Sequence, residues 1–229
     1  MQLVTLAHRI SLLAWFAACQ AATADTPTPT PEHDLAMRFH MHRNFDLLRA
    51  IERLLIRGKL DEARRFAEAI ATAPDEPAHG PWAAHAVAVR DRAMAVARAT
   101  SVDDALRKET RLAAACGDCH REHRGSGMFE RPPAAPPDQP TLDARMARHR
   151  WAADRLWEAV VGDADDAWRA GLDLLAAAPL ELGADRAPLA RELQRLASTA
   201  RGARRPVVDR AGTYGEILVT CAGCHAKPR

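Results

Sequence analysis

The sequence predicts an all-α protein made of two tandem antiparallel four-helix bundles. This expectation comes from a composition that favours helices, from apolar residues at helical spacing and from an internal repeat. The 229 residues are 48% hydrophobic and 27% charged, with only 12 Gly. Ala, Leu, Arg and Glu favour helices, whereas the β-branched and aromatic runs of strands are nearly absent. The length is enough for two domains of about a hundred residues, each with a modest core.

A constant offset of 105 residues relates the two halves of the chain. An offset that holds without an insertion is strong evidence for tandem copies of one domain. Besides pairing Cys116 with Cys221, it pairs Met41 with Met146, Arg43 with Arg148, Asp61 with Asp166, Arg64 with Arg169, Arg90 with Arg195 and Asp104 with Asp209.

Each copy divides into four expected helices. In the first copy, apolar residues spaced by three and four predict a helix over 33–57 that ends at Gly58. Ser101 is a good N-cap for the fourth helix, which carries Cys116. Short loops imply antiparallel neighbours. The other expected helices cover 60–73 and 81–99 in the first copy, and 141–161, 164–178, 187–203 and 207–225 in the second.

The N-terminus has the features of an export signal over residues 1–24. An apolar run at 10–18 has the length of a signal core and is too short to span a bilayer. Cys19 follows two Ala residues, as in a bacterial lipobox, and is therefore a candidate for acylation. Ala22-Thr-Ala24 offers an ordinary cleavage site as the alternative. Both predict export to the periplasm, and the first also predicts a membrane-anchored lipoprotein.

Two Pro-rich segments separate the remaining parts. Residues 25–32 are expected to form an extended tether, and residues 131–140 a linker between the domains 33–130 and 141–229. The net charge of +2 gives no reason to expect a nucleic-acid partner.

Four of the five Cys lie in two CxxCH motifs, Cys116-Gly-Asp-Cys119-His120 and Cys221-Ala-Gly-Cys224-His225. On a helix, the two thiols of such a motif lie one turn apart and can form thioethers with one porphyrin. The His that follows is then the proximal iron ligand. A zinc site or a disulfide would leave the two His residues unexplained. We therefore expect two covalently bound haems c.

The sixth iron ligand is expected from the first helix of each copy. Met41 and Met146 are the metal-competent residues that the repeat places in register, and a thioether ligand raises the haem potential. Core packing by these Met residues, with five-coordinate iron, is one alternative. A His ligand is another, because His149 follows Met146 by three residues and His40 and His42 flank Met41.

Arg43 and Arg148 lie two residues past these Met residues. They are expected either to pair with haem propionates or to be solvated. His79, His85 and His123 have no His counterpart in the second copy and are expected to be surface or loop residues.

Each copy thus carries a CxxCH motif at the end of a fourth helix and a Met on the first. In this it resembles the class II cytochromes c, the family that includes cytochrome c-prime, over residues 33–125 and 141–229. The resemblance implies bundles of the cytochrome c-prime type. It also implies that low-spin members use the Met as a ligand and transfer electrons, whereas cytochrome c-prime proper leaves that position open and binds small gases. Two copies in one chain depart from the usual single-domain form.

The expected function is that of an electron carrier without enzymatic activity, which exchanges electrons with redox partner proteins. The alternative is a gas-binding or sensing protein with at least one five-coordinate haem. A dihaem peroxidase-like enzyme has no support beyond the number of haems.

Overall fold

A computed structural model of the chain describes residues 31–74, 82–123, 134–177, 180, 182–201 and 207–226. The secondary structure of these ranges consists of eight α-helices without a strand, which confirms the all-α prediction. None of these eight helices is long and apolar enough to cross a bilayer. The expected signal segment and Cys19 lie outside the described residues.

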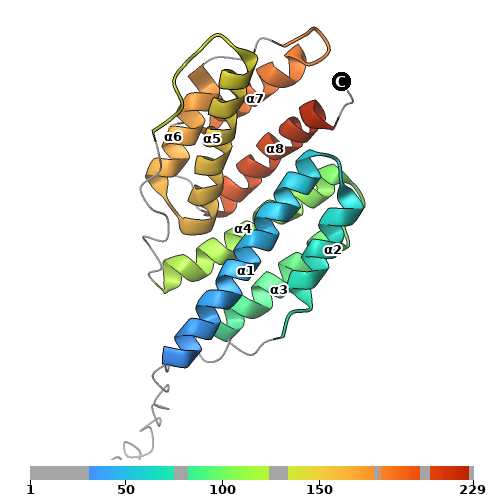
Figure 1. The fold of residues 1–229 in the computed structure, drawn as a ribbon, viewed down its shortest axis with the longest axis vertical. Helices are drawn as coiled ribbons and strands as arrows, with labels where there is room; N and C mark the ends of the chain where they lie inside the picture. The colour runs from blue at the N-terminus through green and yellow to red at the C-terminus, as the bar shows by residue number, and fades with distance from the viewer. Residues whose placement is uncertain are drawn as a thin grey trace, which may run out of the picture.

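The helices follow one another through the two copies (Figure 1). The first, α1, begins at Pro31, so the last two residues of the expected tether 25–32 are already helical. Pro is well tolerated in a first helical turn, because its missing N–H has no partner there. The bounds are α1 (Pro31–Ile56), α2 (Leu60–Ala71), α3 (Ala83–Ala97), α4 (Val102–Glu122), α5 (Leu142–Gly162), α6 (Asp165–Ala177), α7 (Ala187–Ala200) and α8 (Val207–His225).

Two local signals act as the sequence predicts. Gly58 follows α1 with a φ of 75°, a left-handed conformation that is easiest for Gly. Ser101 precedes α4, and its hydroxyl accepts a hydrogen bond from the N–H of Asp104 at 3.1 Å. The end of α5 differs, because Asp163 adopts a φ of 53° there. Its carboxylate accepts a hydrogen bond from the buried Arg210 at 3.2 Å, which holds the chain in this conformation.

Within each copy the four helices pack on one another in chain order, and the first also packs on the fourth. The connections from α1 to α2 and from α5 to α6 are short, so these neighbours run antiparallel (Figure 1).

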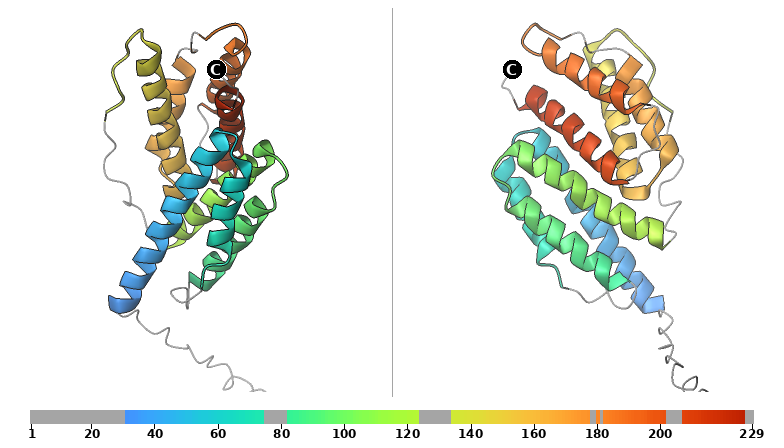
Figure 2. Two further views of the ribbon diagram at one scale, coloured as in Figure 1. Left: turned by 45° about the vertical axis from the view of Figure 1, so that its right-hand side comes forward. Right: turned by 180° about the vertical axis from the view of Figure 1, so that it is seen from behind.

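The two halves pack tightly through α4 and α8, which lie side by side in the right view of Figure 2. Their directions are opposite: Arg107 pairs with Glu216 at 2.7 Å, and a Cβ at Gly215 would lie 3.0 Å from the hydroxyl of Thr110. Buried side chains from both halves belong to one hydrophobic cluster. The two copies therefore share a core.

Equivalent residues of the repeat meet at this interface. Arg49 of α1 forms an ion pair with Asp154 of α5, and these positions differ by the repeat offset of 105. Glu109 of α4 and Tyr214 of α8 have the same offset and are both fully buried at the interface. Contacts between equivalent residues indicate an approximate two-fold relation between the copies.

A buried polar network lies near this two-fold position. The Tyr214 hydroxyl donates to Glu52 Oε2 at 3.0 Å, and Arg49 donates to Glu52 Oε1 at 2.9 Å. Glu109 has no hydrogen-bond partner among the described residues for either carboxylate oxygen. Burial, followed by the charge of Glu52, raises the pKa of Glu109 well above its ordinary value. The Glu109 carboxyl therefore stays neutral to a higher pH than an exposed Glu.

Candidate functional site

The two CxxCH motifs lie in the last turns of α4 and α8, where the sequence predicts them. Cys116 and Cys221 pack against the shared core, and all four motif cysteines are free thiols. Burial raises the pKa of Cys116 to about 12 and that of Cys221 to about 12. Both thiols are therefore protonated at neutral pH.

The motifs lie at opposite ends of the α4–α8 interface, because the two helices run antiparallel (Figure 2). Arg107 of α4 is opposite Glu216 of α8. From this level, Cys116 lies further along α4 and Cys221 further along α8, in opposite directions. A rise of about 1.5 Å per residue then separates the two Cys by about 20 Å along the helix axes.

His120 is oriented by the second copy. Its Nδ1 lies 2.7 Å from the carbonyl oxygen of Val161 at the end of α5. A carbonyl oxygen only accepts hydrogen bonds, so Nδ1 carries the proton and Nε2 keeps its lone pair. A hydrogen bond of this kind on one ring nitrogen typically accompanies metal binding by the other.

Gly117, between the two Cys of the first motif, packs against the backbone of α5. A Cβ at this position would lie 2.3 Å from the carbonyl oxygen of Val160, a distance that side-chain carbons do not reach without displacement of the backbone. The first motif therefore needs Gly here. The equivalent residue of the second motif is Ala222, which is buried at 3% exposure.

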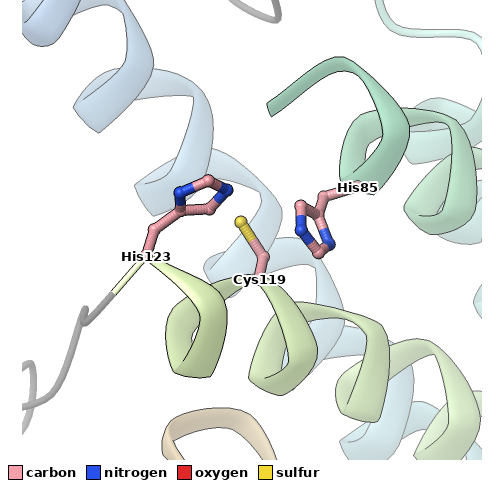
Figure 3. A group of neighbouring side chains, drawn as sticks. All are labelled: His85, Cys119 and His123. Carbon is pink, nitrogen blue, oxygen red and sulfur yellow. The ribbon is translucent and has the colours of Figure 1, made fainter. Parts of the chain in front are cut away.

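Cys119 has two His neighbours, which Figure 3 shows around its sulfur atom. The potential ligand atoms of His85, Cys119 and His123 all lie within 4.8 Å of one another. His85 comes from α3, and His123 directly follows α4. The rings of His85 and His123 meet edge to face, with centroids 5.4 Å apart. Imidazole and thiolate groups are both good transition-metal ligands.

The hydrogen bonds of the two rings differ. His85 Nε2 lies 3.0 Å from Glu122 Oε2, whereas His123 Nε2 is buried and has no hydrogen-bond partner among the described residues. The expectation that His85 is a surface or loop residue is wrong, because it lies in a helix and its side chain is only 17% exposed. His79, for which the same was expected, lies outside the described residues.

The expected distal residues of the first copy lie on α1. Met41 is 41% exposed, and His42 is also exposed. His40 is partly buried, and its Nε2 lies 2.9 Å from the amide nitrogen of Asn44. Burial lowers the pKa of His40, and the charges of Arg43 and Arg90 lower it further. Ligation by Met41, His40 or His42 stays a prediction.

In the second copy, Met146 and His149 are both partly buried on α5. Burial, followed by the charge of Arg148, lowers the pKa of His149 to about 4. The imidazole is therefore neutral at physiological pH, which is the form that binds metals. Met146 and His149 both stay candidates for the second iron.

Arg43 and Arg148 both donate to backbone carbonyl groups. Arg43 reaches Ala69 O at 3.1 Å, and Arg148 reaches Pro136 O at 2.6 Å. Their pairing with haem propionates stays a prediction.

The described neighbours of the second motif differ from those of the first. His225, the last residue of α8, is exposed. A Cβ at Gly223 would meet the Leu189 side chain of α7 at an ordinary 3.4 Å. The repeat places Ala190 at the position of His85, and Ala190 is buried at 4% exposure. This copy therefore has no imidazole at that position of its third helix.

Taken together, the side chains at each motif fit a covalently bound haem. Two thiols lie one helical turn apart on each of α4 and α8, and a His follows each pair. At the first motif, the proton position on His120 leaves Nε2 free for iron. Comparisons with known proteins add no assignment: no family model matches the chain, and no curated protein or solved structure is detectably similar to it.

Proposed function

We propose that the chain is an exported dihaem cytochrome of the c type that carries electrons, with two bundles of the cytochrome c-prime kind. The observation that carries this proposal is the recurrence of CxxCH at equivalent helix ends of a duplicated domain. A zinc or disulfide function gives no reason for a His after each Cys pair.

The residues of each motif have separate roles. The partly buried Cys116 and Cys221 and their partners Cys119 and Cys224 would add across the vinyl groups of the porphyrin, so that each thiol hydrogen moves to carbon and nothing is released. His120 and His225 bind the iron through one ring nitrogen. A bound haem supplies a one-electron iron couple, and the apolar core on which the motifs pack lowers the polarity around it.

The arrangement of the motifs suits a relay. They lie at opposite ends of the α4–α8 interface, so each haem is available to a different redox partner protein (Figure 1). Export through residues 1–24 would place the carrier in the periplasm, and acylation of Cys19 would hold it at the membrane. Carriage of electrons needs no substrate site, so we propose no enzymatic activity.

A gas-binding second haem is the other candidate. It is favoured by Ala190, which stands in the second copy where the first has His85. If neither Met146 nor His149 bound the iron, this haem would be five-coordinate and open to carbon monoxide or nitric oxide.

The test is to express the full chain with its signal in a host that attaches haem c. The denatured protein should keep its haem, and a redox titration of the native protein should show two reversible one-electron steps. A chain without covalent haem would refute the cytochrome. Haems that stay high-spin and bind carbon monoxide at both sites would refute the carrier in favour of the gas-binding protein.

A further inference from the structure

The first motif has a potential ligand that its counterpart lacks. His85 projects from α3 toward the sulfur of Cys119, which Figure 3 shows between the two His rings. Cys119 would join the edge of the porphyrin through this sulfur, so a haem held there would lie in the space beside His85. A side chain that faces this sulfur from the opposite helix is therefore well placed for the distal side of the iron.

Met41 lies at a comparable level but faces outward. Glu52 of α1 lies close enough to Glu109 of α4 for its charge to raise the Glu109 pKa, which aligns the two antiparallel helices. Counting eleven residues back along α1 and eleven forward along α4 brings Met41 level with His120, next to Cys119. Met41 is nevertheless 41% exposed, whereas the His85 side chain is 17% exposed. Of these two residues, His85 is the one that the fold directs at the motif.

A carboxylate accompanies His85. The hydrogen bond between its Nε2 and Glu122 leaves the other ring nitrogen for a metal. Histidine ligands in metal sites commonly donate their second N–H to a carboxylate, which fixes the ring and makes it a better donor. His123 packs against the edge of the same ring and further restricts its rotation.

His123 itself is less suited to the distal position. It lies on the same helix end as His120, three residues further along. His85 comes from a different helix, α3, and can therefore approach the iron from another direction than His120, which is held against α5. The buried Nε2 of His123, which has no hydrogen-bond partner in the described part of the chain, instead adds a polar group to the space that His85 and Cys119 share.

The geometry points to His85 as the distal ligand of the first haem, which makes this haem bis-histidine and leaves the second haem to ligands from α5. This inference rests on the proposed function. It replaces Met41 as the distal ligand of the first copy and gives the two haems different ligation. A Met ligand raises the haem potential relative to His, so Met146 on the second iron would set the two potentials apart.

The experiment compares three variants of the full-length holoprotein: His85→Ala, His123→Ala and Met41→Ala. Covalent haem is first measured on denatured protein, which reports attachment regardless of the distal ligand. Helix content by circular dichroism then shows that each variant is folded. The spin state of each haem is measured by electron paramagnetic resonance and by optical spectra, with and without added imidazole.

The expected result is that His85→Ala keeps two covalent haems but converts one of them, half of the total, to high spin. Added imidazole should return this haem to low spin, because it replaces the missing side chain. His123→Ala and Met41→Ala should leave both spin states unchanged. A second substitution, His85→Met, should keep the first haem low-spin and introduce the near-infrared band of a Met–iron bond.

Two results would overturn the inference while leaving the cytochrome intact. One is an unchanged spectrum in His85→Ala together with a high-spin haem in Met41→Ala or His123→Ala. The other is an unchanged near-infrared spectrum in His85→Met. A protein with no covalent haem at the first motif, but with stoichiometric zinc that His85→Ala removes, would refute both the ligand and the proposed function at that motif.

Discussion

The first and second CxxCH motifs occupy equivalent positions of the repeat but have different neighbours. The first is enclosed: Gly117 touches the α5 backbone, His120 is hydrogen-bonded to Val161, and His85 faces Cys119. The second lies at the end of the last helix, with His225 exposed and with Ala190 in place of His85.

This difference shows how equivalent motifs of a duplicated domain can acquire different neighbours. The helix plan and the motif are common to both copies, so the proposed haem attachment would be the same at both motifs. The side chains around the motif come from other helices, and these have diverged. At the first motif α5 contributes Val160 and Val161, and beside the second motif a Cβ at Gly58, which follows α1, would lie 3.3 Å from the Cβ of Ala226.

The largest effect on stability is expected when one methyl group is added to the first motif by the substitution of Gly117. Gly117→Ala would place a Cβ 2.3 Å from Val160 O, so α4 and α5 have to separate. We expect a loss of about 3 kcal/mol in the free energy of unfolding, measured by urea denaturation, and weaker low-spin character at the first haem. In the matched control Gly223→Ala, the new Cβ would meet Leu189 at 3.4 Å. Equal losses in the two variants would mean that the motifs are not differently enclosed.

The free energy of unfolding is expected to depend on pH through a residue at the centre of the interface. At this position of the repeat the first copy has Glu109 and the second has Tyr214. The pKa of Glu109 is raised from 4.5 in the folded state, so its contribution to stability is complete below about pH 4.5 and is lost as the pH rises through the folded pKa. Over that window, stability should fall by up to about 1.4 kcal/mol per pH unit for this one group.

Glu109→Gln removes this titration and should flatten the fall in stability, measured by denaturation at several pH values. Some slope should remain, because burial also raises the pKa of Glu52. A slope identical to that of the unchanged protein would show that Glu109 does not hold its proton in the folded state.

The smallest effect on stability is expected for an ion pair at the exposed edge of the α4–α8 interface. Arg107 and Glu216 pair at 2.7 Å, but both side chains are 45% exposed. Water and salt screen such a pair, so Arg107→Ala should cost only about 0.5 kcal/mol. The cost should shrink further in high salt, measured by the same denaturation assay. A larger, salt-independent loss would mean that Arg107 contributes to packing rather than to the ion pair.

Local features of the fold could be predicted from the sequence because they depend on nearby residues. Gly58 ends α1, Ser101 caps α4, and the apolar spacing places all eight helices within a few residues of their bounds. Periodicity reports which face of a helix is buried, but not which helix covers it. The packing of α4 on α8 and the shared core could therefore not be predicted from a single sequence.

The same limit applies to the candidate site. The spacing within CxxCH is local and could be found, whereas the contact between His85 and Cys119 joins helices that are distant in the chain. The repeat register predicts a ligand that both copies share, and His85 does not meet this condition because its equivalent is Ala190. A ligand that is present in only one copy cannot be predicted from a comparison that requires the same residue in both copies.

The attachment of two haems is tested most directly by the mass of the intact mature chain under denaturing conditions. We expect the mass of the polypeptide plus two haems. Replacement of Cys116 and Cys119 by Ala should remove one haem, and replacement of Cys221 and Cys224 by Ala should remove the other. A mature chain with the mass of the bare polypeptide, from a host that attaches haem to a control cytochrome c, would contradict it.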